Sequence, residues 1–343
     1  MQQIEHRETH PVPYTLTWEG DVGDRLDAYY GSDGWRRALD PAIRRIPGPS
    51  LGVVSHLMAQ YTDPYGSTWQ ADRRPFHLLK PAISAPSLEG YLWPSVDACF
   101  EPDWKEQALA AVKELQGHFL VVGFGFGLFE RTWALRGFSE ALMDAVASPG
   151  FYAELLEAVA AHQMAIIERL LELPVDGILF SDDWGYQRGV LLGANRWRQL
   201  LKPHLARMYA RVHDAGKYVL SHCCGDVAEI LPDLIEIGVD VLESVQPEAM
   251  DPYELKQRYG EDMTFWGGLG SQSVIPLGRP DEIRREVARL CCEMARGGGY
   301  ILSPAKPLQP DTPTENAAAV VEAFLDQGGA LHGCSPTWQR LQV

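Results

Sequence analysis

The stretch "YVLSHCCGDVAEILPDLIEIGVDVLESV", residues 218–245, decides the fold. It opens with a short apolar run, continues through glycine and polar residues into a segment with apolar residues three and four positions apart, and ends in a second apolar run. The two runs are typical of buried strands, and the spacing between them is typical of a helix. A strand, a helix and a strand in succession predict a parallel sheet.

The same unit repeats on both sides of this stretch. Apolar runs recur at 175–180, 218–221, 239–245, 263–268 and 300–303, and the segments between them have helical spacing. Upstream, 119–125 is another strand candidate, and 52–58 is the only tidy one in the first 110 residues. In a chain of 343 residues this repeat favours a single α/β domain, an eight-stranded (β/α)8 TIM barrel, over an open doubly wound sheet. We assign 1–50 to an N-terminal extension packed on the barrel, and 51–343 to the barrel itself.

The charge of the chain limits its partners. It has 46 acidic and 30 basic residues, a formal net charge of -16, which repels nucleic acid and anionic membrane surfaces. The longest largely apolar run, 119–129, is about half of the roughly 20 residues that cross a bilayer. We therefore expect a cytoplasmic protein that acts on a small-molecule substrate, without nucleic acid or membrane partners.

In a (β/α) barrel the active site lies on the loops that follow the carboxyl ends of the strands. The residues at these positions are unusual for a core and useful for chemistry, so we expect them to meet at one rim. We predict catalytic roles for Asp183, His222, Cys224 and Glu243, and substrate-binding roles for Asp182, Trp184, Tyr186, Arg188, Gln246, Trp266 and Lys306.

The neighbouring aspartates Asp182 and Asp183 cannot both face the barrel axis, because side chains alternate along a strand. We favour Asp183 for the axis. Its carboxylate could be a general base, a partner for a substrate cation, or an acceptor for His222. In the competing interpretation one aspartate caps a loop and the other is solvated.

His222 and Cys224 lie two residues apart and share a face if the strand continues, whereas Cys223 points toward the helices. A His-x-Cys pair is half of a zinc site, which needs at least one further Cys, His or carboxylate. Glu243, at the end of the next strand, is the nearest candidate. The alternative is a buried pair of thiols beside a hydrogen-bonded histidine.

Several motifs together resemble the uroporphyrinogen decarboxylase superfamily. They are "VDGILFSDDWG" (175–185), the stretch 202–260, "FWGGLGSQ" (265–272) and "GGGYILSPAKPLQPDTPTEN" (297–316). The resemblance covers about 115–328, with weaker echoes in "DPYGSTWQ" (63–70) and "LEGYLWPS" (88–95). It implies a closed (β/α)8 barrel with the active site in its mouth.

Two chemistries occur in that superfamily. The decarboxylases carry an arginine-bearing "RQAGR" element that grips the porphyrinogen carboxylates, and nothing like it precedes "THPVPYTLTW" (9–18). The methyltransferase branch moves methyl groups between corrinoids and thiols such as coenzyme M, with a zinc site of His-x-Cys and a distant cysteine. His222 and Cys224 match the first half of that site, and the resemblance places Lys306 where the cysteine would stand.

A protonated lysine cannot ligate zinc, so the resemblance implies that Glu243 completes the metal set with His222 and Cys224, or that zinc is held weakly. The leading hypothesis is a methyltransferase-like enzyme with a corrinoid, carried on a partner protein, as co-substrate. The second is a metal-independent decarboxylase that uses Asp183 and Lys306. The third is a protein that binds a corrinoid or tetrapyrrole between aromatic residues of the mouth. The resemblance also suggests a homodimer.

Overall fold

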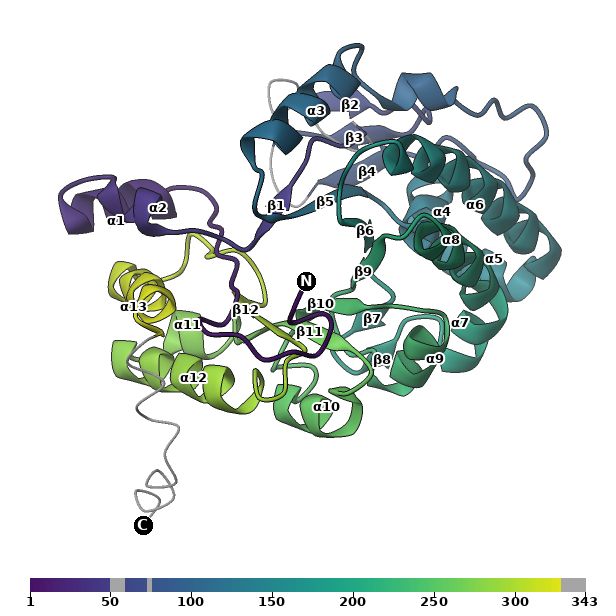
Figure 1. Cartoon of the computed structure of the whole chain (residues 1–343). Helices are drawn as coiled ribbons and strands as arrows, with labels where there is room; N and C mark the ends of the chain where they lie inside the picture. Colours follow the sequence, from purple (N-terminus) through teal and green to yellow (C-terminus); the bar gives the residue numbers. More distant parts are fainter. Residues whose placement is uncertain (50–58, 73–75, 328–343) are drawn as a thin grey trace.

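A computed structural model describes residues 1–49, 59–72 and 76–327. The strand candidate at 52–58 lies outside these residues. Within them, the dominant feature is a curled sheet of seven strands, all of them parallel to their neighbours (Figure 1). In sheet order the strands are β1 (Ile43–Arg45), β5 (Phe119–Phe124), β6 (Gly177–Ser181), β9 (Tyr218–His222), β10 (Val241–Val245), β11 (Thr264–Leu269) and β12 (Tyr300–Pro304). The α/β barrel architecture predicted from the sequence is confirmed.

The N-terminal segment 13–15 joins the two edges of this sheet. The amide of Thr15 donates to the carbonyl of Leu302 at 2.9 Å, and the amide of Leu302 donates to the carbonyl of Pro13 at the same distance. On the other side, the amide of Ala42, next to β1, donates to the carbonyl of Tyr14 at 2.9 Å. The segment therefore bonds to β12 and to the residue before β1, and so lies between the two edges of the sheet.

Helices cover the outside of the sheet, and most connect successive strands (Figure 1). They are α1 (Val22–Tyr30), α2 (Gly34–Ala38), η1 (Val96–Cys99), α3 (Trp104–Glu114), α4 (Leu128–Arg136), α5 (Phe138–Ala147), α6 (Pro149–Leu171), α7 (Ala194–Leu200), α8 (Lys202–Asp214), η2 (Ala228–Ile230), α9 (Leu231–Glu236), α10 (Pro252–Tyr259), α11 (Val274–Leu277), α12 (Pro280–Glu293) and α13 (Thr314–Leu325). Among the described residues, no helix is both long and apolar enough to cross a membrane.

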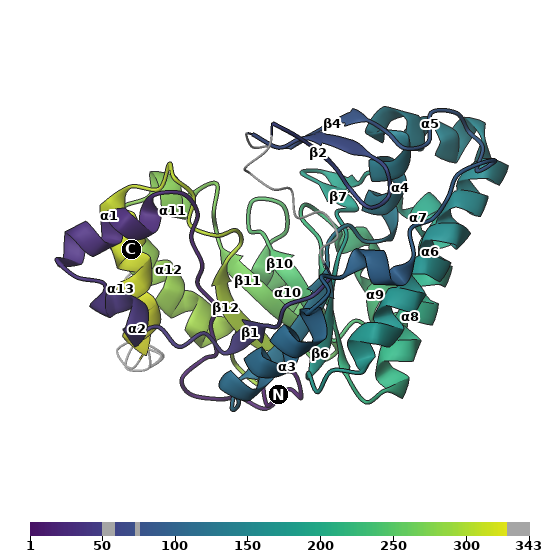
Figure 2. The same ribbon diagram turned by 90° about the horizontal axis from the view of Figure 1, so that it is seen from above.

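The first hundred residues also form a small antiparallel sheet of β2 (Gln60–Thr62), β3 (Thr68–Gln70) and β4 (His77–Lys80). It lies beside α4, where the hydroxyl of Ser67 donates to the carbonyl of Ala134 at 2.7 Å (Figure 2). A two-stranded ribbon, β7 (Gly185–Tyr186) and β8 (Gly189–Val190), follows β6. The sequence patterns did not identify these short strands.

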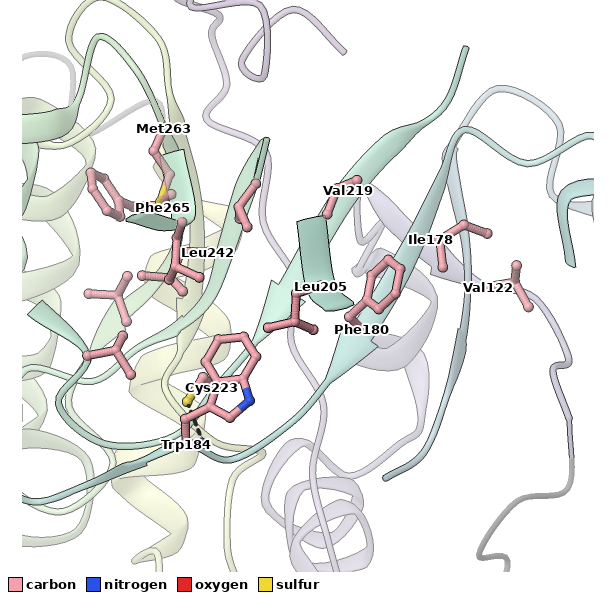
Figure 3. Close-up of a cluster of buried hydrophobic side chains, with 14 of the residues drawn as sticks. Val122, Ile178, Phe180, Trp184, Leu205, Val219, Cys223, Leu242, Met263 and Phe265 are labelled. Atoms are coloured by element: carbon pink, nitrogen blue, oxygen red, sulfur yellow. Dashed lines mark hydrogen bonds between the residues drawn. The ribbon is translucent and has the colours of Figure 1, made fainter. Parts of the chain in front are cut away.

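Side chains alternate along the strands between two apolar layers. Those pointing outward pack under the helices, as Figure 3 shows for Ile178, Phe180 and Val219. Those pointing inward fill the barrel, and this inner cluster comprises Ile4, Ile43, Phe119, Val121, Leu179, Leu220, Val241, Trp266 and Ile301. Because residues i and i+1 of a strand face opposite sides, one short strand contributes to both layers. Ile4 comes from no strand, so the N-terminal segment is part of the barrel core.

We predict that Ile4→Ala lowers the free energy of unfolding by about 2–5 kcal/mol, because it leaves a cavity in the inner layer. Urea denaturation measures the change. Leu92→Ala is the control, since Leu92 is 87% exposed and its truncation should have little effect. An Ile4→Ala protein as stable as the wild type would show that the N-terminal segment does not contribute to the core.

Candidate active site

The candidate site forms at the carboxyl ends of β6, β9 and β10. His222 is the last residue of β9, and its Nε2 lies 3.6 Å from the Sγ of Cys224. Both side chains are half-buried. Cys223, between them, is fully buried and belongs to the outer layer, where its Sγ accepts from the amide of Trp184 at 3.2 Å (Figure 3). His222 and Cys224 therefore share a face, and Cys223 points toward the helices.

Asp183 reaches the same place from the loop after β6. Its Oδ1 accepts from the amide of Cys224 at 2.8 Å and lies 3.7 Å from Nε2 of His222. Asp183, His222 and Cys224 each offer one ligand atom, and these atoms all lie within 4.8 Å of one another. A carboxylate, an imidazole and a thiol at this spacing could hold a metal ion such as zinc.

Glu243 faces the other nitrogen of the same imidazole. Its Oε2 lies 3.4 Å from Nδ1 of His222 and 3.6 Å from Nη2 of Arg45. Burial disfavours the imidazolium, but the charges and hydrogen bonds of Glu243 and Cys224 outweigh it and raise the pKa of His222 well above its usual value. For Glu243, burial is outweighed by His222 and Arg45, which lower its pKa. Glu243 thus holds the imidazole from behind, and Asp183 is the carboxylate beside Cys224.

Asp182 has a structural contact in place of the predicted substrate contact. It is buried, and its carboxylate accepts from the amides of Phe129 and Glu130 at 2.9 and 2.8 Å, the first turn of α4. It also accepts from Nε1 of Trp184 at 2.6 Å. Burial raises the pKa of Asp182 to about 7 despite these three donors. Of the two aspartates, Asp183 faces the site and Asp182 fixes the helix beside it.

The two tryptophans expected at the rim are both buried. Trp184 is 1% exposed and packs edge-on against Trp197, with ring centroids 5.4 Å apart. Trp266 is 4% exposed in the inner layer, and its Nε1 donates to the hydroxyl of Thr15 at 2.8 Å. The expectation of an aromatic rim made by these residues is therefore wrong: both indoles find apolar neighbours and a hydrogen-bond acceptor in the interior.

The remaining predicted residues divide by exposure. Tyr186 and Arg188 are exposed on the β7–β8 ribbon, and Lys306 is exposed after β12. Gln246 is buried just after β10. Among the described side chains, Glu243 forms ion pairs with His222 and Arg45, and not with Lys306. The substrate-binding roles of these four residues stay predictions.

Two charged residues of the site were missed by the sequence analysis. Arg45 lies on β1, which is three residues long and has no strand-like pattern. Glu130 lies in the first turn of α4, where burial and the nearby charges of Asp182 and Asp183 raise its pKa to about 9. Nothing in the sequence marks Glu130 as different from an ordinary acidic residue at the start of a helix.

The family model described as uroporphyrinogen decarboxylase (URO-D) matches residues 105–326. The chain belongs to the uroporphyrinogen decarboxylase family. Among curated relatives, the methylcobamide:CoM methyltransferase MtaA of Methanosarcina barkeri is 28% identical to this chain over 172 residues. The chain is 26% identical over 222 residues to a uroporphyrinogen decarboxylase of Syntrophotalea carbinolica.

The first alignment covers 50% of this chain and 48% of the methyltransferase, and the second covers 61% of this chain and 60% of the decarboxylase. The chain thus spans about half the length of the curated relatives that it matches. Among solved structures, it resembles a methyltransferase from Methanosarcina mazei with a TM-score of 0.71, covering 95% of this chain and 96% of the other at 19% identity. That likeness shows the barrel fold.

We predict that Asp182→Asn lowers the free energy of unfolding by about 1–3 kcal/mol, because the amide offers one acceptor oxygen to three buried donors. Chemical denaturation measures the loss. Asp311→Asn is a matched control at an exposed position, with an expected change within about 0.5 kcal/mol. Equal stability of the two variants would mean that Asp182 does not hold α4.

Proposed function

We propose that this chain is a methyltransferase-like enzyme. It would move a methyl group between a small methylated substrate, carrying a methoxy or methylthio group, and a corrinoid or thiol acceptor. The observation that carries the proposal is the cluster of Asp183, His222 and Cys224, whose ligand atoms lie within 4.8 Å of one another at the carboxyl ends of the strands. Thiol chemistry at the mouth of a barrel is what such a donor set can support.

The donor set fits zinc. Cys224 supplies a soft sulfur ligand, His222 an imidazole nitrogen, and Asp183 a carboxylate oxygen, which are three of the ligand types that zinc accepts. Zinc bound there would lower the pKa of a thiol and present it as a thiolate. Glu243 would act as the partner of Nδ1 and fix the orientation of the imidazole, as carboxylates behind ligating histidines do.

The corrinoid would be presented by a partner protein. The similarity to the methylcobamide:CoM methyltransferase of Methanosarcina barkeri supports this part of the proposal. Tyr186 and Arg188 are exposed on the ribbon next to the cluster, and Lys306 is exposed on the loop after β12. We propose these side chains as contacts for the substrate or for the corrinoid partner, with Gln246 lining the site from β10.

We predict that Cys224→Ser and His222→Ala weaken zinc binding at least about 10-fold, since each removes a direct ligand and even an indirect contact is worth that much. Competition with a chromophoric chelator measures the affinity. Cys223→Ala is the control, because it removes a neighbouring thiol that faces the helices.

The same titration identifies the carboxylate ligand. We expect Asp183→Asn to weaken zinc binding more than Glu243→Gln does, because Asp183 lies beside Cys224 and Glu243 lies behind the imidazole. The opposite order would make Glu243 the third ligand. Tight zinc binding that survives Cys224→Ser would show that the cluster is not the metal site.

We predict that the protein, incubated with cob(I)alamin and a panel of methoxylated or methylthio compounds, produces methylcob(III)alamin for at least one compound. Visible absorbance follows the reaction. Cys224→Ser should reduce the rate at least about 10-fold, and Cys223→Ala should retain it.

Decarboxylation of uroporphyrinogen III is the alternative, supported by the similarity to the Syntrophotalea carbinolica enzyme. We expect negligible turnover of that substrate. The decarboxylases hold its carboxylates with charge-assisted contacts from an arginine-bearing element, and nothing like that element precedes residues 9–18 of this sequence. If no compound of the panel yields methylcob(III)alamin and the protein decarboxylates uroporphyrinogen III, the decarboxylase replaces the proposed methyltransferase.

A further inference from the structure

Arg131 is a fully buried arginine with unused hydrogen-bond donors. It lies on α4, its side chain is 1% exposed, and Nε, Nη1 and Nη2 are all without a hydrogen-bond partner. Burying a charged guanidinium is costly unless its donors are satisfied, and native structures leave few buried polar groups unpaired. A buried cation of this kind is a candidate binding site for a polar group of a ligand.

Among the described residues, the acidic side chain that forms an ion pair with Arg131 does not use these donors. Asp63 lies 3.7 Å from Nη1 of Arg131, beyond hydrogen-bond distance. Its Oδ1 accepts from the amides of Tyr65 and Ser67 at 3.0 Å, and its Oδ2 accepts from Nε1 of Trp69 at 2.9 Å. The carboxylate is therefore occupied by the β2–β3 turn, and it balances the charge of Arg131 without satisfying its N–H groups.

Aromatic rings define the directions from which a ligand could reach Arg131. The Tyr65 ring covers one face of the guanidinium, with the centroid 3.9 Å from Cζ, and the Phe126 ring lies 5.1 Å away. Phe126 in turn stacks on Trp69 with centroids 5.4 Å apart. A ligand must therefore approach in the plane of the guanidinium, where it would also contact aromatic rings.

A second unpaired polar atom lies in the same region. Gln163, on α6, is buried, and its Nε2 donates to the carbonyl of Phe126 at 3.0 Å while its Oε1 has no partner. The nearby imidazole of His162 adds no second cation, because burial and the charge of Arg131 lower its pKa. Two helices thus bring unsatisfied polar atoms into one buried region beside aromatic rings, with Arg131 as its charge.

Arg131 is connected to the candidate active site through the start of α4. Arg131 follows Glu130, whose amide is held by Asp182, and Asp182 precedes the candidate ligand Asp183. The β2–β4 sheet, which supplies Tyr65 and Asp63, lies beside α4 (Figure 2). The first turn of α4 thus connects Arg131 to the residues around the His222–Cys224 pair.

We propose that Arg131 binds the carboxylate of the substrate, so that the substrate is a small organic acid with an apolar or aromatic body. This inference rests on the proposed function, because it assigns the acid end of that substrate. A carboxylate matches the planar fork of a guanidinium with two parallel hydrogen bonds. It is also flat, which suits a group that lies in the plane of the guanidinium beside Tyr65 and Phe126.

The test is calorimetric titration of the full-length protein, free of metal and corrinoid, with benzoate and with benzamide, its neutral isostere. We expect benzoate to bind at millimolar concentrations and benzamide not to bind. Arg131→Met should weaken benzoate binding about 10- to 100-fold, the loss of a charge-assisted bidentate contact. Arg289→Met is the matched control, since Arg289 also stacks on a tyrosine, Tyr253, with Cζ 3.7 Å from the ring centroid.

Arg131→Met leaves Asp63 without its cation, so folding is checked by circular dichroism, and the double variant Asp63→Asn/Arg131→Met restores neutrality. Asp63→Asn alone should keep or strengthen benzoate binding, because it removes a competing negative charge. If wild-type protein binds no benzoate, or if Arg131→Met or the double variant binds it as well as wild type, the inference is overturned.

The titration is independent of methyl transfer. If benzoate binding depends on Arg131 but the protein transfers no methyl group, the anion site is supported and the proposed function is rejected. Methyl transfer without Arg131-dependent binding removes the anion site and leaves the proposed function in place.

Discussion

The carboxylate of Asp182 is the contact on which the candidate site depends. It joins the loop after β6 to the first turn of α4, more than 50 residues earlier, through the amides of Phe129 and Glu130. It also accepts from the indole of Trp184, two residues further along its own loop. Because Asp182 is fixed from both sides, Asp183 must turn the other way, toward the amide of Cys224 and the ring of His222. A carboxylate at the start of a helix also meets the positive end of the helix dipole, which makes this anchor favourable in a buried place.

The barrel itself depends on a contact that is equally remote in sequence. Its parallel sheet has two edges, β1 and β12, and the segment 13–15 bonds to β12 and to Ala42, next to β1. Trp266 fills the interior below the site and donates to Thr15 of the same segment, while Ile4 enters the inner layer. Residues near the N-terminus therefore position strands whose far ends carry the candidate site. The inner layer is a packed core, so the candidate site lies at the rim of the barrel and not in its interior.

The sequence was sufficient for the repeated units and for the pairing of His222 with Cys224, because both follow from the alternation of side chains along a strand. The orientation of Asp183 was anticipated by the same argument. The sequence was insufficient where contacts with distant residues determine the position of a side chain more strongly than the local pattern does. Trp184 and Trp266 were expected in the mouth because they follow strands, but each indole has an acceptor inside the protein, Asp182 or Thr15. Arg45, Glu130 and Arg131 carry no motif, and their environments arise from β1, from the turn of α4 and from the β2–β3 turn, which pattern alone did not reveal. The proposed boundary at residue 50 stays a prediction.

The charges of the site explain how a protein of net charge -16 could accept an acid. His222 lies between two carboxylates, Asp183 and Glu243, and Glu243 also pairs with Arg45, so the charges at this end of the site largely balance. Arg131, beyond Glu130 on the same helix, is paired in charge with Asp63 but not in hydrogen bonds. Long-range repulsion from surface carboxylates is screened within about 10 Å at ordinary salt concentrations, whereas a buried guanidinium acts at contact in a medium of low dielectric. Local donors, and not the net charge, therefore decide which end of the proposed substrate binds where: a soft group toward Cys224, and an acid group toward Arg131.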